Sequence, residues 1–516
     1  MLEKLFGIKR KQASIKSEII GGLITFIAMC YILPVNSAIL SDMGMDKTGV
    51  FVMTAIVSFI VTMIMGAVAN YPIVLSAGMG LNAFLAYTLS DAMGFSSWHQ
   101  KMILLTIAGV IFFALSLTPL RKIIIEAIPK DLKCIISASL GGFIMFVGLR
   151  NSGIIGDGST LVELGNLGDP AILIGLVAVV ITVGFMFSKN KVLSTMAIPF
   201  GILIAAVIGI VTSEILVSTG HLAIFQDSYG VDYWGYKFWD GQVLHQVKTA
   251  LPIAPWRDNS VLAMFNPVNT FGQIKEVFAF GLLGSGDMIQ NTEGVKELVP
   301  YTASTFGNDI ITVLANPATY VAIFSLMFVN LFDTTATLIA VGEKTGIIDE
   351  NGKMQNYRRA VLADATGALI CAPLGTSTVT SFAESNVGIA MGAKTGLSAV
   401  VAAFMFLLSI FIYPVFSIFT AGSVTVPALV CVGLLIMIGG FKGLNFKDPV
   451  VAFTSIIMVV FSVLCYSISN GIGIGLIAYC VMMLFSKRGK EVSVPIYVIA
   501  ALFIVSFAAT TVIKFI

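Results

Sequence analysis

The chain has 516 residues, of which 57% are hydrophobic and only 11% are charged. A soluble protein of this length would have about a quarter of its residues charged, so the composition excludes an ordinary soluble globular protein and indicates a polytopic membrane protein. The net charge of +2 gives no reason to expect binding to nucleic acid.

Residues that usually bind metals or perform covalent chemistry form no recognisable pattern. The six cysteines mostly lie in apolar runs, without the spacing of a zinc site or of an extracellular disulfide framework. The three histidines lie in loop-like sequence, and no Walker, HExxH or GxSxG motif occurs. The sequence therefore predicts no metal site, no organic cofactor and no enzymatic activity.

The first half of the chain predicts a basic arm followed by seven membrane spans. Residues 1–17 are basic and amphipathic and precede a long apolar stretch, so we expect a cytoplasmic arm rather than a cleaved signal peptide. Because a helix needs about 20 apolar residues to cross a bilayer, we predict spans at residues 18–40, 50–69, 72–89, 100–119, 132–149, 170–188 and 192–212.

The second half predicts seven more spans after a wetter segment. Residues 213–316 are rich in Trp, Tyr, Asp and Pro and predict a long external loop. The further spans are predicted at residues 317–342, 358–373, 375–392, 396–419, 424–441, 448–468 and 470–486. The C-terminal region, residues 487–516, contains one more apolar segment, 493–514, which is expected to be an extra span or an interfacial helix.

The positions of the basic residues predict an N-terminus in the cytoplasm. With that orientation, Lys and Arg concentrate in the inner connecting segments, as the positive-inside rule requires. Seven spans in each half give the two halves opposite orientations, which is the arrangement of inverted repeats. Weak internal similarity agrees, because residues 139–155 resemble 426–444 and residues 194–211 resemble 468–485. The predicted fold class is therefore an all-α polytopic membrane protein with fourteen spans in two inverted repeats.

The third and tenth spans differ from the others because they are interrupted by Pro, Gly and small polar residues. The third span begins with Pro72, and Pro373 lies just before the tenth. Each span then has a short β-branched stretch and continues as a plausible half-helix. Broken segments at corresponding positions of two repeats indicate the binding site of a transporter. Two packing helices rich in glycine are the alternative interpretation. We expect short strands at these breaks, next to a cavity.

Two acids, Asp333 and Glu384, lie within apolar segments long enough to cross a bilayer. Intramembrane acids are costly and usually functional, and burial favours their protonated forms, so both are candidates for proton coupling. Carboxylates, amides and aromatic faces together suit a planar heterocycle with alternating donors and acceptors. The predicted substrate site comprises Asp333, Glu384, Asn82, Thr337, Phe332, Phe382, Asn386, Ala383 and Phe84.

Four segments carry a specific family resemblance: residues 18–36 (EIIGGLITFIAMCYILPVN), 76–87 (SAGMGLNAFLAY), 328–346 (FVNLFDTTATLIAVGEKTG) and 375–396 (GTSTVTSFAESNVGIAMGAKTG). The chain resembles the AzgA-like branch of the nucleobase:cation symporter-2 superfamily over nearly its whole length. That resemblance implies proton-driven purine uptake across the plasma membrane, and the sequence leaves the choice among hypoxanthine, guanine, adenine and xanthine open. It also places Asp333 and Glu384 at the positions of the family's two substrate-binding acids.

The resemblance further implies a core domain and a gate domain. The core would comprise residues 18–120 and 317–420, and the gate residues 121–212 and 421–486. Uracil-type relatives have a histidine one turn after the first acid, whereas this chain has Thr337, so a histidine-based coupling step does not transfer. The expected partners are a purine base and the lipid bilayer; a homodimer stays open as the assembly.

Other functions fit the sequence less well. A sulfate-type anion carrier of the same architecture would not favour two acids at mid-membrane depth. A channel would need a continuous polar lining, whereas the polar residues here cluster at one depth. Sodium stays open as the coupling ion in place of the proton.

Overall fold

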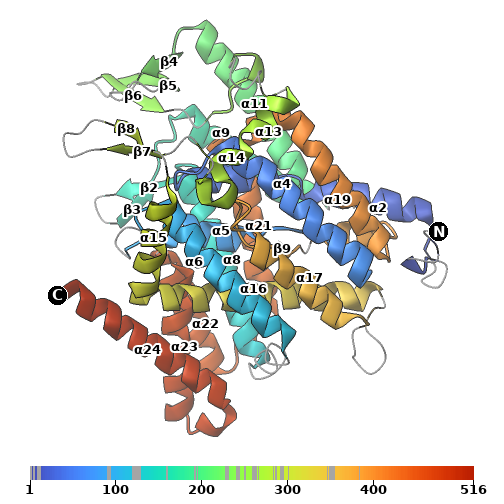
Figure 1. The fold of residues 1–516 in the computed structure, drawn as a ribbon, viewed down its shortest axis with the longest axis vertical. Coiled ribbons are helices and arrows are strands. Elements are labelled where there is room, and N and C mark those ends of the chain that lie inside the picture. Colours follow the sequence, from blue (N-terminus) through green and yellow to red (C-terminus); the bar gives the residue numbers. More distant parts are fainter. Residues whose placement is uncertain are drawn as a thin grey trace.

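The computed structural model is mostly helical and is described for most of the chain (Figure 1). The described residues are 3, 6–8, 13–89, 94–118, 129–158, 161–190, 193–194, 196–226, 232–239, 244–248, 251–257, 264, 266–282, 284, 287–290, 296–299, 301–345, 347, 355–382, 384–465 and 467–515.

Helices or strand–helix pairs occupy the seven segments predicted as spans in the first half. Several helices begin at a side chain that caps their free N–H groups; the Asp46 carboxylate, for example, accepts the Gly49 N–H at 2.6 Å. The elements are α2 (Ile15–Met29), α3 (Ile32–Ser41), α4 (Lys47–Ile64) with the π-turn η1 (Met65–Ala69), β1 (Leu75–Ala77), α5 (Met79–Ala83) with the π-turn η2 (Phe84–Thr88), α6 (Trp98–Leu117), α8 (Lys130–Asn151), α9 (Pro170–Met186) and α11 (Ala197–Ser218).

The second half has a corresponding series that begins with a sharp bend. Helix α15 (Ala303–Ala315) meets α16 (Pro317–Thr345) at 83°, because Pro317 cannot continue the preceding helix. The series continues with α17 (Tyr357–Ile370), β9 (Val379–Ser381), α18 (Ser385–Ala390), α19 (Gly396–Ser409) with η6 (Ile410–Ile412), α20 (Tyr413–Ser417) with η7 (Ile418–Thr420), α21 (Gly422–Lys442), α22 (Pro449–Leu464), α23 (Ile468–Phe485), η8 (Gly489–Glu491) and α24 (Val494–Phe515).

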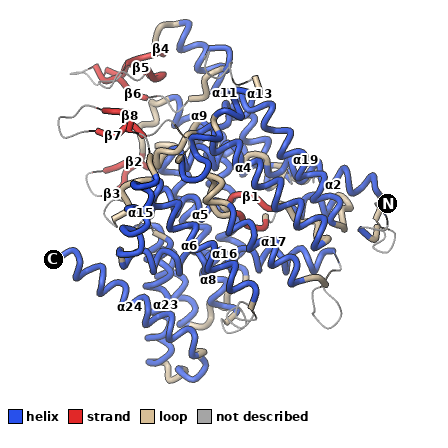
Figure 2. The backbone as a smooth tube through the Cα atoms, viewed as in Figure 1, coloured by secondary structure: helices blue, strands red, loops and turns tan. Residues whose placement is uncertain are grey.

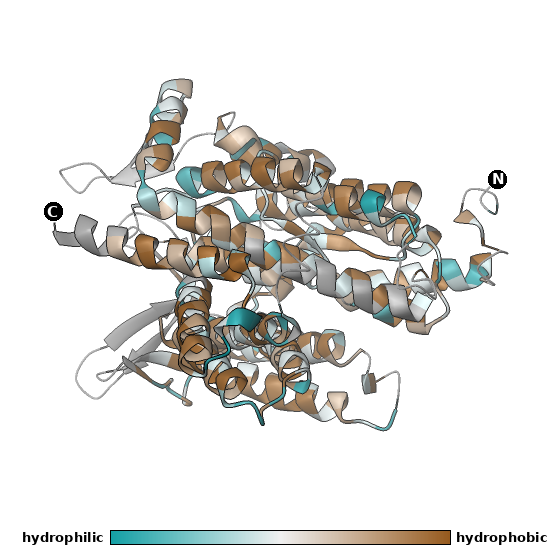
Figure 3. Ribbon diagram, turned by 90° about the horizontal axis from the view of Figure 1, so that it is seen from below, coloured by the Kyte–Doolittle hydropathy of each residue, from teal (hydrophilic) through white to brown (hydrophobic). Residues whose placement is uncertain are grey.

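The apolar character of the outer surface fits a membrane protein. Within the described residues, seven helices are long and apolar enough to cross a bilayer, and the bent pair α15–α16 is an eighth candidate. Large apolar side chains stay exposed along α9 and α11, among them Val180 at 64% and Val207 at 61%. Exposed apolar surface of this extent indicates a lipid-facing surface. Figure 3 shows that hydrophobic residues, in brown, predominate along most of the helices.

The described residues of the segment predicted as a long external loop, 213–316, include strands and short helices, so the mostly helical fold also contains sheets that the sequence did not predict. Helix α11 extends to Ser218, and strands follow where side chains alternate along aromatic-rich sequence. A count of long apolar runs overlooks such short strands. The elements are the sheet β4 (Leu222–Gln226), β5 (Asp232–Trp239) and β6 (Leu244–Lys248), then η4 (Pro255–Arg257), α13 (Pro267–Gly272), α14 (Ile274–Val277), η5 (Phe278–Gly281), and the hairpin β7 (Asp287–Gln290) and β8 (Lys296–Val299).

A further hairpin, β2 (Ile155–Gly158) with β3 (Leu161–Leu164), follows α8. It lies on the same side of the molecule as β4–β8, opposite the N-terminus (Figure 2). The strands β2–β8 are therefore gathered on one side of the molecule.

The strands β1 and β9, from the broken third and tenth segments, pair with each other in antiparallel orientation, with Ser76 opposite Thr380. Two backbone bonds extend the pairing, from Gly78 N–H to Thr378 O at 2.9 Å and from Phe382 N–H to Val74 O at 3.0 Å. Side chains of α4 complete the pairing of β1, because Thr62 Oγ1 both accepts the Leu75 N–H and donates to the Leu75 carbonyl. Irregular backbone inside a membrane protein needs such partners.

The C-terminal segment forms helix α24, which packs against α23 and α16. Its Phe503 is 2% exposed and meets Phe324 of α16 edge to face at 5.6 Å. Figure 1 shows α24 running past α23 toward the side where the hairpins lie. The helix is thus an integral part of the helical assembly.

Glu18 joins the first helix to the start of α19 in the second half. It is fully buried, and its Oε1 accepts the N–H groups of Lys394 and Thr395 at 2.8 and 3.0 Å, while its Oε2 accepts that of Ser398 at 3.3 Å. The first N–H groups of a helix have no partner within it, and a carboxylate is the most favourable acceptor there. The acid therefore caps α19 across the two halves.

Replacing Glu18 by alanine is expected to destabilise the protein by about 2–3 kcal/mol, because buried N–H groups lose a charged acceptor. The measurement is the apparent melting temperature of purified protein in detergent. Glu163→Ala is the matched control, because Glu163 is exposed on β3. Equal melting temperatures for Glu18→Ala and the wild type would contradict the capping role.

Candidate functional site

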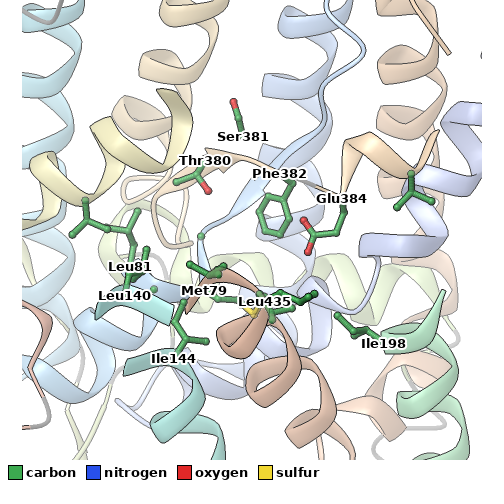
Figure 4. Close-up of a pocket in the computed structure, with 16 residues that line it drawn as sticks. Met79, Leu81, Leu140, Ile144, Ile198, Thr380, Ser381, Phe382, Glu384 and Leu435 are labelled. Atoms are coloured by element: carbon green, nitrogen blue, oxygen red, sulfur yellow. The ribbon is translucent and has the colours of Figure 1, made fainter. Parts of the chain in front are cut away.

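A cavity of about 310 Å³ lies where the paired strands end. A cavity of this volume suits a small organic ligand. One wall comes from α5 and the glycine before it, α16, β9 and the residues that follow it, and α18; the other comes from α8, α11 and α21 (Figure 4). The first wall comprises Gly78, Met79, Gly80, Leu81, Val329, Thr380, Ser381, Phe382, Glu384 and Val387, and the second Leu140, Ile144, Ile198, Val432, Leu435 and Ile436.

Glu384 is the one ionisable side chain among the described residues that line the cavity. It follows the β9 strand directly and forms the N-cap position of α18. Figure 4 shows its carboxylate beside the ring of Phe382, directed toward Met79 and Leu435. The acid therefore faces an otherwise largely apolar space, where a hydrogen bond to a ligand is stronger than in water.

Tyr31 contacts Glu384 from outside the cavity lining. The Tyr31 hydroxyl donates to Glu384 Oε1 at 2.7 Å, and Tyr31 is not among the residues that line the cavity. It lies at the break between α2 and α3, where Pro34 supplies no N–H to the Cys30 carbonyl and so interrupts the helical bonding. The break thus places a polar side chain at the middle of an apolar segment.

Phe382 provides a flat surface and the opposite wall an aliphatic one. Phe382 is only 6% exposed, and its backbone is fixed by the hydrogen bond to the Val74 carbonyl. The opposite wall contains only aliphatic side chains among its described residues. A planar ring could therefore lie against Phe382 while its polar edge meets Glu384.

Asn82 lies in a different environment from the one expected of a ligand contact. Its side chain is fully buried, is absent from the cavity lining, and donates from Nδ2 to Asn36 Oδ1 at 2.9 Å. Asn36 Nδ2 in turn donates to Thr54 and Thr376, at 2.8 and 3.0 Å. This buried network joins α3, α4, α5 and the start of the tenth segment behind the cavity.

The other predicted site residues take various positions. Phe84 begins the π-turn η2 and is 3% exposed, Thr337 is buried on α16, and Asn386 is the second residue of α18. None of these three is among the residues that line the cavity.

Three predicted residues fall outside what the structure describes. The side chains of Asp333 and Phe332 and the whole of Ala383 are not described. The backbone of α16 nevertheless gives position 333 a defined register, because Val329, one helical turn earlier, lines the cavity.

Sequence reasoning missed Tyr31 and the whole aliphatic wall. Tyr31 had a signal, since it is a polar side chain in an apolar span three residues before a proline. The wall had one as well, because Leu140 and Ile144 lie in the segment 139–155, and Val432, Leu435 and Ile436 in the similar segment 426–444. The two internally similar segments therefore both contribute to the aliphatic wall of the cavity.

Several characterised proteins are similar to this chain over nearly its full length. It is 36% identical to the guanine/hypoxanthine permease PbuO of Bacillus subtilis over 504 residues, which are 97% of this chain and 99% of that protein. It is 34% identical to the guanine/hypoxanthine permease PbuG of the same organism, with 98% and 99% covered. It is 31% identical to the adenine permease AdeP of Escherichia coli, with 98% and 95% covered.

Solved structures agree in fold at low sequence identity. The transmembrane domain of the cyanobacterial bicarbonate transporter BicA matches with a TM-score of 0.53 at 14% identity, covering 88% of this chain and 97% of that domain. The murine anion transporter Slc26a9 in its inward-facing state matches with a TM-score of 0.53 at 11% identity, covering 92% of this chain and 69% of that one.

The family model described as the Permease family (Xan_ur_permease) matches residues 16–252 and 287–474, most of the chain. The chain therefore belongs to this family of permeases, the nucleobase:cation symporter-2 family.

Proposed function

We propose that this protein is a secondary active transporter that imports purine nucleobases, with hypoxanthine and guanine as the first substrates to test and adenine as the next. The observation that carries the proposal is the Glu384 carboxylate, held by Tyr31 in a cavity large enough for a bicyclic base. The printed functions of the relatives, guanine/hypoxanthine and adenine permeases, support the same substrate class.

The lining of the cavity suits the two chemical faces of a purine. A carboxylate accepts hydrogen bonds from ring N–H groups, and Phe382 offers a surface for the ring itself. We place Asp333 as the second acid, because its backbone position follows the cavity residue Val329 by one turn of α16. Two acids that can share a proton then titrate as a pair.

The architecture we propose has fourteen spans in two inverted repeats. The wall that contains the strands would belong to a core domain, and the aliphatic wall to a gate domain. The likeness in fold to BicA supports this arrangement. Helix α24 would be an additional span, because it packs against both α23 and α16. The N-terminus would be cytoplasmic in the plasma membrane, as the distribution of basic residues favours.

Movement of the core against the gate would carry the base across. Ionised acids raise the free energy of that movement, because charged side chains would have to move past an aliphatic wall. A proton together with the bound base neutralises the site and lowers this cost, which is the physical basis of proton symport. Sodium remains the competing coupling ion, and replacing it by choline in the uptake buffer separates the two.

An anion carrier is the second candidate, and the fold of BicA and Slc26a9 favours it. The acid in the cavity argues against it, because a buried carboxylate repels an anion.

The test is uptake of radiolabelled hypoxanthine, guanine and adenine by a host that lacks its own purine permeases. We expect saturable uptake that a proton ionophore abolishes. Thermal stabilisation of the purified protein by bases, and not by sulfate or bicarbonate, gives an independent measurement. Stabilisation by the anions alone would refute the proposal in favour of the second candidate.

A further inference from the structure

Tyr31 makes a contact that ties the two halves of the chain together at the cavity. It is 4% exposed, and its hydroxyl donates to Glu384 Oε1 at 2.7 Å. The contact joins the break in the first span to the break in the tenth. A tyrosine at this place can therefore act on the chemistry of Glu384 without touching the ligand.

The hydrogen bond makes the two oxygens of Glu384 unequal. Oε1 accepts the Tyr31 hydroxyl, so this side-chain hydrogen bond distinguishes Oε1 from Oε2, which keeps the larger capacity to accept from a ligand. If a proton bound to Oε1, two O–H groups would oppose each other, and one buried donor would lose its acceptor. Because an unsatisfied buried donor is costly, the proton binds preferentially to Oε2.

We propose that Tyr31 is a positioning residue that directs the exchangeable proton of Glu384 to Oε2, the oxygen that the Tyr31 hydroxyl does not contact. Ionised Glu384 then presents an acceptor to the ligand, and protonated Glu384 presents a donor at the same atom. The role of Tyr31 in coupling rests on the proposed function, because it assumes that the proton and the base both bind at Oε2. Coupling follows because the two events change the same hydrogen bond.

Few other ionisable groups can influence this pair. Cys30 adjoins Tyr31, and Asp333 lies one turn beyond Val329 on α16. The described cavity-lining residues of α5, α8, α11, α18 and α21 include no ionisable side chain. The Tyr31 hydroxyl is therefore the principal described polar contact of Glu384.

Infrared difference spectroscopy of the purified protein tests the selection directly and without substrate. Acidification is expected to produce a carboxylic C=O band that is absent in Glu384→Gln. With the proton on Oε2, the carbonyl is Oε1, which receives the Tyr31 hydrogen bond. Tyr31→Phe removes that bond and should move the band to higher wavenumber, because a hydrogen bond weakens the C=O bond. An unshifted band would place the proton on Oε1 and overturn the proposal.

Uptake measurements give the functional consequence. Tyr31→Phe is expected to raise the apparent KM for the base about tenfold, because the carboxylate loses its orienting partner. The pH profile of uptake should also differ from that of the wild type, because the hydroxyl contacts one of the two oxygens that can bind the proton. A purely structural role would lower the amount of folded protein without moving the profile.

Tyr71→Phe is the matched control. Tyr71 is 1% exposed, its hydroxyl donates to the Gln355 carbonyl at 2.6 Å, and it lies outside the cavity lining. It should leave both the C=O band and the pH profile unchanged.

The two proposals can fail separately. If the wild type shows the C=O band but transports no base, the proposed function is refuted, and the band shift in Tyr31→Phe still tests the role of Tyr31. An unchanged pH profile in Tyr31→Phe, with base uptake intact, would overturn the role in coupling alone.

Discussion

Replacing Glu384 by glutamine is expected to lower the affinity for a purine base by about 10- to 100-fold, because hydrogen bonds to charged groups contribute about 1.5–3 kcal/mol. Glutamine has nearly the same shape, so the cavity and the contact with Tyr31 should survive. The exchangeable proton is lost as well, so we expect uptake driven by a proton gradient to fall to background. The measurements are equilibrium binding of labelled base and concentrative uptake.

The control for this variant is Glu163→Gln, which makes the same change at an exposed acid on β3. Wild-type binding and uptake are expected for that control. Facilitated exchange of base across the membrane can persist in Glu384→Gln, because exchange needs no net proton movement. Concentrative, ionophore-sensitive uptake by Glu384→Gln at the wild-type rate would remove the acid from the mechanism.

Replacing Gly433 by leucine is expected to prevent stable folding of the protein. Helices α8 and α21 cross at Gly141 and Gly433, where a Cβ atom on Gly433 would lie 2.5 Å from Met145 N and 2.7 Å from Gly141 O. The obstructing atoms belong to the backbone and cannot rotate away. Even alanine should cost about 1–3 kcal/mol, as overpacking does elsewhere.

Gly439→Ala gives a matched comparison on the same helix, because no atom lies within 4 Å of a Cβ built there. We expect it to express and melt like the wild type, whereas Gly433→Ala melts lower and Gly433→Leu yields little monodisperse protein. Gel filtration in detergent and a thermal scan measure both. Equal behaviour of Gly433→Ala and Gly439→Ala would mean that the crossing is looser than the structure has it.

Some parts of the fold could be predicted from the sequence because they depend on local composition or on the length of apolar runs. The length of apolar runs reports on membrane crossing, since the bilayer has a fixed thickness. The interruption of the third and tenth segments by proline and glycine marked the strands β1 and β9, although their register was not predictable. The folded strands between residues 222 and 299 were missed, since short extramembrane strands leave no long apolar signal.

The candidate site likewise contains residues that the sequence could identify and residues that it could not. Glu384 stands out in sequence because an acid in an apolar segment is expensive wherever it points. Its partner could not be inferred, because the 353 positions that separate Tyr31 from Glu384 carry no pairing information in a single sequence. Asn82 has the chemistry of a ligand contact, yet its Nδ2 donates to Asn36, and only packing determines which polar groups pair with one another.

The sequence by itself determined that this chain is a membrane protein with broken segments and a buried acid, because hydrophobic length, helix-breaking residues and the cost of intramembrane charge are local quantities. The tertiary structure alone decided which surfaces enclose the cavity and which side chain contacts the acid. Those outcomes depend on contacts between residues hundreds of positions apart. Glycines let helix backbones approach closely, and buried donors must pair with acceptors, and together these requirements select one packing of the helices.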